Sequence, residues 1–343
     1  MKSIIAMMLV SFILTCQVIY CQSIDKVQFF KEDSALNVTL ESYWTKVINQ
    51  KNKMGHIFPA RFICRINDSI TANEPVGLQV RGHFRRDYCY IPPLKLTFYK
   101  DSPSVMHSLK SLKLVSACRL TDGYEQYLLK EFIVYKLYNL ITDKSFRVRL
   151  LNLEYKDSSE KKSSFKNYSF LTEDVKEVSK RNECKEWVKG KVNTEATNRK
   201  QMTIVALFEY MIGNTDWSVS AEHNIKFIQS KADSNSRPYP VAYDFDYSGI
   251  VNTEYAVPDP LLNTETVQQR VYRGFPRTMD ELNEALGIFK QQKEKMYALV
   301  NNFELLNTRN KKNMIAYLES FYTDIKNPKD IKYLFIDNAR TGY

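Results

Sequence analysis

Two short groups of oxygen-donor side chains stand close together in the second half of the sequence. Asp216 follows an apolar run, and Asn224 comes shortly after it, just before a strand-like run. Asp244 and Asp246 flank a single phenylalanine directly after the next strand-like run. Carboxylate and amide oxygens are the ligands that hard cations such as Mg²⁺ and Mn²⁺ prefer. Because strand and helix ends can hold polar groups over a cleft, this spacing predicts a metal-dependent site for phosphoryl transfer.

Each of these residues also has a purely structural interpretation. Asp216 follows Gly-Asn-Thr and could cap a turn, and Asp244 and Asp246 could cap loops. Asn224 could satisfy a loop backbone, and the neighbouring His223 could be a hydrogen-bonding loop residue. The order and spacing of the whole set, and not any one member, favour a site.

The elements that would hold these groups differ between the two halves of the chain. Apolar and polar residues alternate in runs typical of strands at Leu36–Leu40, Ile57–Ile66, Gly77–Arg81, Leu94–Tyr99, Leu109–Val115, Phe146–Tyr155 and Asn167–Thr172. A period near 3.6 predicts a helix at Tyr124–Leu140, and the run Met202–Ile212, apolar on nearly all sides, predicts a buried helix. The pattern also predicts helices at Thr278–Asn302 and Lys311–Tyr322, with Thr278 or Asp280 as an N-cap. We therefore expect an α+β protein with two lobes. Residues 23–175 would form an antiparallel sheet lobe with one helix, and residues 176–343 a mainly helical lobe that carries the metal and catalytic loops.

The order of the charged residues along these elements matches the parts of a protein kinase. A lysine on a strand, Lys95, precedes a glutamate on a helix, Glu131. A later strand ends at Glu173, where a kinase chain would enter its hinge. The basic turn that begins at Arg81 occupies the region of the glycine-rich loop. Phosphoryl transfer needs positive charge on the phosphates, metal between their oxygens and a carboxylate near the attacking hydroxyl.

Several segments of the sequence also resemble one particular family of kinase-like proteins. The runs VRGHFRR, PPLKLTF, KLVSAC, YLLKEFIVYKLYNLIT, SFRVRLL, GNTDW, HNIK and YDFD resemble the spore-coat protein H (CotH) kinase-like family of secreted atypical kinases, over about residues 75–275. The resemblance implies a bilobal kinase-like fold, Mg²⁺ or Mn²⁺ as cofactor, ATP as co-substrate, and a protein or glycan hydroxyl as acceptor. It also implies the following roles: Lys95 and its partner Glu131 at the nucleotide with Arg81 and Glu173, Asp216 as catalytic aspartate, and Asn224, Asp244 and Asp246 as metal ligands.

Other functions stay open. The metal loop reads D-F-D-Y-S-G, and no G-x-G-x-x-G loop is present, so a catalytically inactive binding or surface-assembly protein on the same scaffold is the alternative. A metal-dependent hydrolase that uses the same carboxylates ranks below both. Acyl transfer is unsupported, because the chain has only four histidines and no G-x-S-x-G motif.

The first 22 residues predict a secretory signal. Lys2 supplies the positive end, and Ile4–Tyr20 supplies the apolar run. No later run reaches the ~20 apolar residues of a membrane span, so we expect a secreted, periplasmic or cell-surface protein. A lipid anchor at Cys21 is a lesser alternative, because Tyr20 stands where a lipobox has a small residue.

Cysteines and charge complete the sequence-based expectations. Cys89 and Cys118 each lie beside a strand-like run of the same predicted sheet, which makes them the favoured disulfide pair. Four buried thiols, with Cys64 and Cys184, are the alternative. The net charge of +10 is spread along the chain without a dense block, so we expect no nucleic-acid partner.

Overall fold

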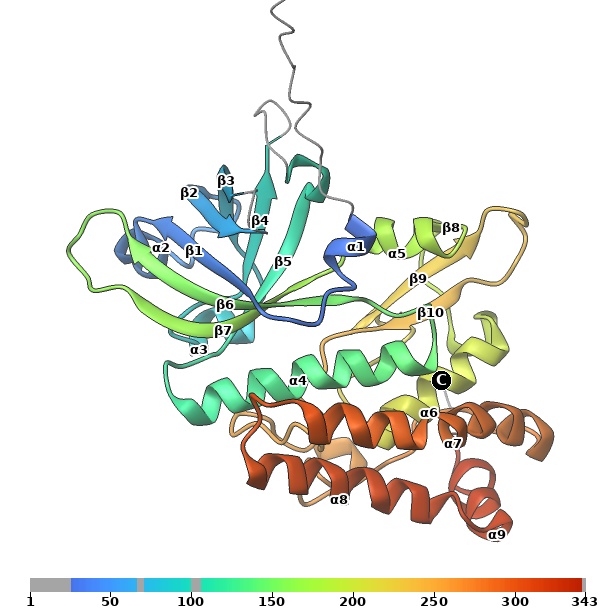
Figure 1. Cartoon of the computed structure of the whole chain (residues 1–343). Coiled ribbons are helices and arrows are strands. Elements are labelled where there is room, and N and C mark those ends of the chain that lie inside the picture. The colour runs from blue at the N-terminus through green and yellow to red at the C-terminus, as the bar shows by residue number, and fades with distance from the viewer. Residues whose placement is uncertain (1–25, 67–70, 100–105, 341–343) are drawn as a thin grey trace, which may run out of the picture.

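Seven strands of the N-terminal half close into a barrel (Figure 1). The computed structural model describes residues 26–66, 71–99 and 106–340; the predicted signal and Cys21 lie outside them. Around the barrel the strands follow the order β1-β2-β3-β4-β5-β7-β6. Their bounds are β1 Leu36–Ser42, β2 Ile57–Arg65, β3 Thr71–Val80, β4 Leu94–Phe98, β5 Ser111–Ser116, β6 Val148–Asp157 and β7 Phe165–Thr172.

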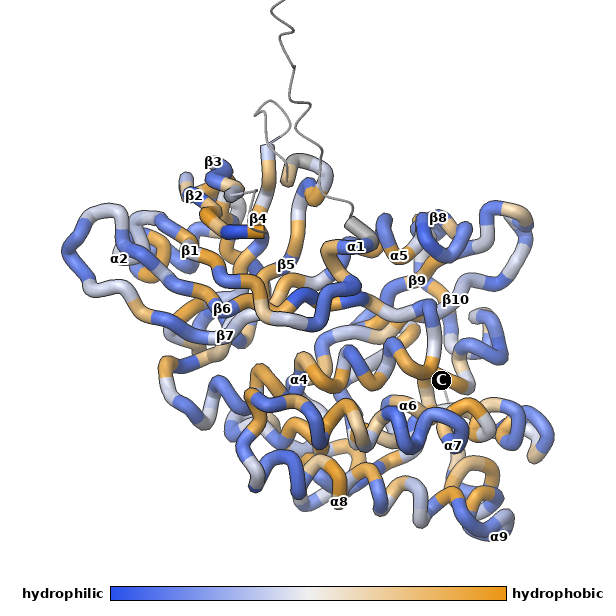
Figure 2. Tube along the Cα trace, viewed as in Figure 1, coloured by the Kyte–Doolittle hydropathy of each residue, from blue (hydrophilic) through white to orange (hydrophobic). Residues whose placement is uncertain are grey.

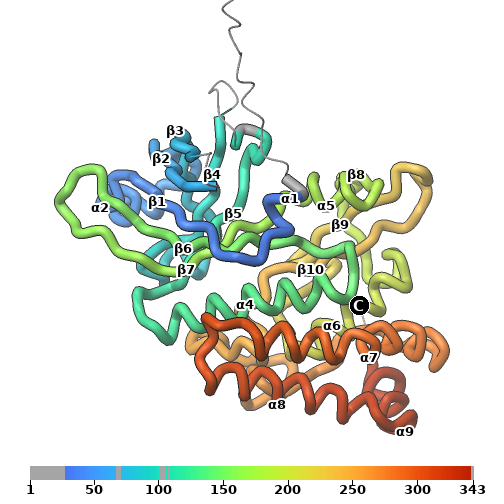
Figure 3. Tube along the Cα trace, in the orientation of Figure 1, coloured from blue at the N-terminus to red at the C-terminus, as the bar shows by residue number. Residues whose placement is uncertain are grey.

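Strand β1 closes the barrel because both of its edges are paired. It runs antiparallel to β2, with Leu40 opposite Phe62, and parallel to β6, with Leu40 opposite Tyr155. In Figure 3 the blue trace of β1 accordingly runs beside the green trace of β6, although the two are far apart in the sequence. The other neighbouring strands pair in antiparallel fashion, so the barrel is mixed.

The expected bilobal kinase-like fold, with an antiparallel sheet lobe and a mainly helical C-terminal lobe, is wrong. The first half is a closed mixed barrel and not an open antiparallel sheet. The second half carries a three-stranded antiparallel sheet beside its helices, made of β8 (Cys184–Glu186), β9 (Ile225–Ser230) and β10 (Tyr239–Ala242). Alternation along a strand shows which side chains point inward, but it does not say which strand pairs with the second edge.

Period-two alternation gives strand β6 two buried faces. Leu151, Leu153 and Tyr155 belong to the core inside the barrel, whereas Val148 and Leu150 belong to a second core outside it. Successive side chains of a strand point to opposite faces, so one strand contributes to both cores. The barrel wall at this point is therefore also the surface on which helices pack.

Helix α4 (Asp122–Ile141) covers that surface. It packs against β6, β7, α6 (Arg199–Ile212) and α7 (Met279–Asn302). Figure 2 shows hydrophobic residues recurring along α4 and α6, and both helices are largely buried. The predicted helices at Tyr124–Leu140 and Met202–Ile212 are thus confirmed. Glu131 is a buried charged residue on α4, a placement that burial alone would make costly.

The C-terminal helices complete the second core. Helix α7 begins at a capping box in which Thr278 accepts from the Glu281 N–H while the Glu281 carboxylate accepts from the Thr278 N–H. Helices α8 (Thr308–Asp324) and α9 (Pro328–Lys332) follow it. Shorter helices are α1 Lys26–Phe29, α2 Trp44–Asn49, α3 Phe84–Tyr88 and α5 Val175–Arg181. Among the described residues, no helix combines the length and the apolar character needed to cross a membrane.

A disulfide joins Cys89 to Cys118, as the sequence predicts, whereas Cys64 and Cys184 are buried free thiols. Cys89 follows the last residue of α3, and its N–H donates to the Arg85 carbonyl (3.0 Å). Cys118 comes shortly after β5 and accepts from the Tyr90 N–H (2.9 Å). The bridge therefore ties the short helix α3 to the end of β5.

Candidate functional site

The loop that carries Asp216 starts where α6 ends. Gly213 closes the helix in the left-handed conformation, with a φ of 66°. Glycine adopts this conformation without steric cost. The next residue, Asn214, is buried; its side chain accepts from the Asp216 N–H (3.0 Å) and donates to the Glu209 carboxyl group (2.9 Å). Glu209 and Asn214 thus determine where the loop presents Asp216.

Two neighbours hold the Asp216 carboxylate. A hydrogen bond joins its Oδ1 to His223 Nε2 (2.8 Å), and its Oδ2 accepts from Asn224 Nδ2 (3.1 Å). The same Asn224 amide also donates to the Asp216 backbone carbonyl (2.7 Å). The Asp216 side chain nevertheless stays 38% exposed, so it is held in one orientation but open to a second molecule.

Asn224 directly precedes β9, and Asp244 comes two residues after the neighbouring strand β10. The Tyr243 N–H donates to the Asn224 carbonyl (3.0 Å), and the Asp244 N–H donates to Tyr135 Oη (2.9 Å) on α4. Both residues have left-handed backbones, with φ of 53° for Asn224 and 67° for Asp244. Asn and Asp visit this region more readily than other non-glycine residues, which explains why these residue types suit the two positions.

Asp246 is the buried member of the acidic group. Its Oδ2 accepts from Tyr255 Oη (2.8 Å) and lies 3.5 Å from Arg85 Nη1. Burial, followed by the neighbouring Asp244 carboxylate, raises the pKa of Asp246 to about 6, although Arg85 and the Tyr255 hydrogen bond oppose this shift. The carboxylates of this group therefore repel one another, a condition that a bound cation would relieve.

Glu131 faces the same group from α4. It is buried, and its Oε1 has no hydrogen-bond partner in the described part of the chain. Burial and then the Asp246 carboxylate raise its pKa well above the usual value, while Arg85 and Arg81 lower it. Arg85 and Arg81 are the cations with the largest effect on the pKa of Glu131. The resemblance implies Lys95 as the partner of Glu131, so the two arginines take the place expected for that lysine.

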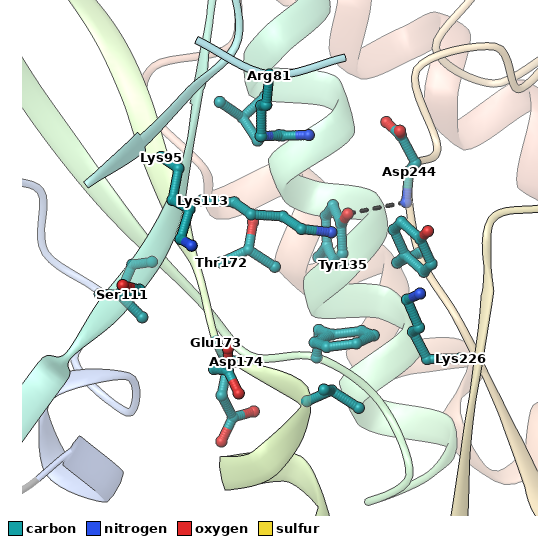
Figure 4. A pocket seen from close by; sticks show the side chains of 15 residues that line it. Arg81, Lys95, Ser111, Lys113, Tyr135, Thr172, Glu173, Asp174, Lys226 and Asp244 are labelled. Carbon is teal, nitrogen blue, oxygen red and sulfur yellow. Dashed lines mark hydrogen bonds between the residues drawn. The ribbon is translucent and has the colours of Figure 1, made fainter. Parts of the chain in front are cut away.

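Lys95 lines a separate cavity of about 270 Å³, which we call the cationic pocket. Four cationic side chains from different strands and strand ends line it: Arg81, Lys95, Lys113 and Lys226. Figure 4 shows Lys95 and Lys113 on one side of the pocket and Lys226 and Asp244 on the other. Tyr135, Tyr243, Phe146 and aliphatic side chains form its walls.

Lys113 lies against an aromatic ring, and its pKa is shifted. Its Nζ lies 4.5 Å from the centroid of the Tyr243 ring. Burial, and then the positive charge of Arg81, lower the pKa of its amine to about 8, although Asp244 acts in the opposite direction. In the free protein the positive charges of Lys113 and Arg81 therefore repel each other. An anionic ligand would relieve this repulsion, so the pocket favours anions.

Glu173 lines the pocket but is engaged in holding the chain. Its carboxylate accepts from Arg181 Nε (3.1 Å) and from the Arg147 N–H (3.0 Å), and its own N–H donates to the Arg147 carbonyl (2.9 Å). Asp174 beside it caps α5 through the Lys176 N–H (2.8 Å). Glu173 was expected to bind the nucleotide, but its side chain already has hydrogen-bond partners within the protein.

The predicted site residues form two groups that share one member. Asp216, Asn224, Asp244, Asp246 and Glu131 form the acidic group, and Arg81, Lys95, Glu173 and Asp244 line the cationic pocket. The sequence did not single out Lys113 or Lys226. Only the fold shows their place: Lys113 lies directly opposite Lys95 in the pairing of β4 with β5, and Lys226 lies on β9.

The expected metal can be tested against these oxygen atoms. In the part of the chain that the structure describes, no group of three or more His, Cys, Asp or Glu side chains is close enough to hold a metal by itself. Mg²⁺ usually takes one or two carboxylates and completes its shell with phosphate and water. Asp244 and Asn224, with the repelled carboxyl of Asp246, fit that smaller requirement.

Comparisons with protein-family models and with curated proteins find no match to this chain.

Proposed function

We propose that the chain is an exported, metal-dependent phosphotransferase. It takes a phosphoryl group from a nucleoside triphosphate such as ATP and transfers it to a hydroxyl group of a protein or a glycan. The sequence resemblance to the CotH family supports this activity, whereas the fold implied by that resemblance is not part of the proposal.

The position of Asp244 is the observation that carries the proposal. It lines the cationic pocket, where it acts on Lys113, and it also raises the pKa of Asp246 in the acidic group. Phosphates held by the lysines would thus lie beside the oxygen atoms that suit a divalent cation. This juxtaposition of cations, metal-ligand oxygens and an open carboxylate is what phosphoryl transfer requires.

The residues would divide the reaction between them. Arg81, Lys95, Lys113 and Lys226 would neutralise the phosphate oxygens and align the terminal phosphorus. The acceptor hydroxyl oxygen would form the new bond to this phosphorus while the bond to the leaving diphosphate breaks. The hydroxyl proton would pass to Asp216, whose carboxylate is held by His223 and Asn224 but remains accessible.

Asn224, Asp244 and Asp246 would hold Mg²⁺ or Mn²⁺. When bound, such an ion neutralises charge on the transferred phosphoryl group and on the leaving diphosphate. One oxygen of Asp246 already accepts from Tyr255, so we assign the principal contact to Asp244, whose side chain lines the cationic pocket.

Export is supported by the disulfide between Cys89 and Cys118, since such bonds persist in oxidising compartments. The apolar N-terminal run of the sequence supports it further. These two features are the basis for placing the reaction outside the cytoplasm.

A non-catalytic binding protein is the second candidate. One specific observation favours it: Arg85 lies 3.5 Å from Asp246 and contributes positive charge where a metal would otherwise be needed. In that case anions would bind in the cationic pocket without transfer.

Ligand-dependent thermal stabilisation tests the proposal. A ligand present at a hundred times its dissociation constant stabilises a protein by about 2.7 kcal/mol. We expect ATP with Mg²⁺ or Mn²⁺ to raise the melting temperature of the unchanged protein. The variant Asp244→Asn suits the same left-handed backbone but lacks the charge, so it should lose the part of this increase that depends on the metal. Asp233→Asn is the matched control, because Asp233 lies in the exposed β9–β10 turn. A shift that is independent of metal, in both variants alike, would leave only the binding protein.

A further inference from the structure

The cationic pocket has more positive charge than its own carboxylates neutralise. Within the described residues, none of its four cationic side chains forms a salt bridge. The barrel sets the positions of three of them: Lys95 and Lys113 are direct partners in the pairing of β4 with β5, and the Arg81 N–H donates to the Pro93 carbonyl (3.0 Å). The fourth, Lys226, lies on β9 of the three-stranded sheet. Three strands thus hold like charges together, an arrangement that a polyanion stabilises.

The segment from Thr172 to Val175, which also lines the pocket, has few side-chain groups left to recognise a base. The Glu173 carboxylate is used by Arg181 and the Arg147 N–H, and the Asp174 carboxylate is used by the Lys176 N–H. The Ser111 hydroxyl shares a hydrogen bond with Thr97 (3.0 Å). These groups could form hydrogen bonds to a base only by giving up the partners that they already have.

Thr172 lines the pocket on β7, directly opposite Lys113 in the pairing of β5 with β7. A hydroxyl can donate or accept, because its hydrogen rotates to suit the partner. It therefore serves the amino group of adenine and the carbonyl group of guanine equally. The apolar walls formed by Val115, Phe146 and Val175 can pack against the face of any base.

We infer that the cationic pocket selects its donor by the triphosphate and not by the base, so that ATP, GTP and inorganic tripolyphosphate bind as one class. This inference rests on the proposed function and names its donor more closely. Lys113 and Lys226, which the sequence did not single out, become the specificity-determining residues together with Arg81 and Lys95.

Isothermal titration calorimetry of the full chain tests the inference without relying on turnover. The probes are ATP, GTP, inorganic tripolyphosphate and AMP, each with Mg²⁺. We expect ATP and GTP to bind within about threefold of each other, since the Thr172 hydroxyl can serve either base and the carboxylates beside it are already engaged. Tripolyphosphate should bind within about tenfold of ATP, and AMP at least about a hundredfold more weakly, since AMP lacks the charges that the lysines bind.

A charge-removing variant adds a second readout. Lys113→Met keeps an apolar side chain over Tyr243 and should weaken ATP, GTP and tripolyphosphate by the same factor, about tenfold. Lys185→Met is the matched control, because Lys185 is an exposed lysine on β8 and lies outside the pocket lining. Its affinities should equal those of the unchanged protein.

The possible failures are distinguishable. ATP that binds ten times or more tightly than GTP, or AMP that binds within tenfold of ATP, would overturn base-independent selection and leave the phosphotransferase intact. If none of the three triphosphates binds, both the inference and the proposed donor fail. Because the ratio of ATP to GTP is measured on the unchanged protein, the test does not depend on how well any variant folds.

Discussion

Glu209 and Asp216 are linked through one side chain, that of Asn214. Asn214 donates to the Glu209 carboxyl group (2.9 Å) and accepts from the Asp216 N–H (3.0 Å). Glu209 lies on α6 and is buried, whereas Asp216 lies on the open loop. The loop that carries Asp216 is thus attached to the interior of the protein through a titratable group, the Glu209 carboxyl.

This attachment makes part of the stability depend on pH. Burial raises the pKa of Glu209 to about 8, from 4.5, although the Asn214 hydrogen bond opposes the shift. Between these values the unfolded chain has lost the proton that the folded chain keeps. The free energy of unfolding therefore falls as pH rises through this window, by at most about 1.4 kcal/mol per pH unit from this group.

Glu209→Gln should remove that pH dependence. The variant should gain stability relative to the unchanged protein at pH 8 more than at pH 5, as measured by denaturant unfolding at both values. Glu304→Gln, at an exposed position, is the control and should leave the slope unchanged. If the free energies of unfolding of Glu209→Gln and of the unchanged protein change in parallel with pH, Glu209 is not neutral in the folded protein.

Asp216→Ala should abolish transfer without unfolding the protein. General-base catalysis contributes about 10²–10⁴-fold, so transfer of labelled phosphate from ATP to peptide and glycan acceptors should fall by that factor. ATP binding should persist, because Asp216 lies outside the lining of the cationic pocket. Asp233→Ala is the control; equal transfer rates in the two variants would remove the catalytic role of Asp216.

Loss of the disulfide should weaken both stability and ligand binding. The bridge closes a loop with a sequence separation of 29, which is worth roughly 3–4 kcal/mol in the chain-entropy model. It also ties down α3, whose Arg85 donates to the Ser116 carbonyl (2.7 Å) and approaches Asp246. The double variant Cys89→Ala/Cys118→Ala should melt several degrees lower and lose metal-dependent ATP binding. Full binding in a destabilised variant would show that α3 is positioned without the bridge.

Gly213→Ala should strain the start of the loop that carries Asp216. The backbone φ of 66° disfavours an L side chain, and the added methyl group would overlap the Tyr317 hydroxyl. We expect a loss of about 1–3 kcal/mol in the free energy of unfolding. The additional change Tyr317→Phe removes the hydroxyl and should restore part of the loss. If it restores nothing, the backbone conformation alone accounts for the cost.

Local features of the fold could be predicted from the sequence. The 3.6-residue period identified α4, an apolar run identified α6, and Thr278, one of two candidate N-caps, marks the start of α7. The pairing of Cys89 with Cys118 followed from strands that belong to one sheet. Each of these depends on residues near one another in the sequence or on neighbouring strands.

Long-range features could not be predicted in the same way. The parallel pairing of β1 with β6 depends on the shape of the whole barrel, so alternation within Leu36–Ser42 gave no sign of it. For the same reason Lys113 and Lys226 looked like ordinary strand lysines, because only folding brings them to one pocket. The acidic residues could be singled out because their types and their spacing along the chain, unlike those of the lysines, are typical of a metal site.

The closure of the barrel by β1 also sets a condition on how the chain folds. Thr39 bonds to Glu154, 115 residues further along, and no earlier strand takes that edge. At ribosomal speeds of about 5–20 residues per second, the first strand therefore waits on the order of ten seconds for its partner. During this interval its apolar residues and unpaired backbone groups are available to other chains. The nascent N-terminal segment is therefore where we expect chaperones to bind and where aggregation would start.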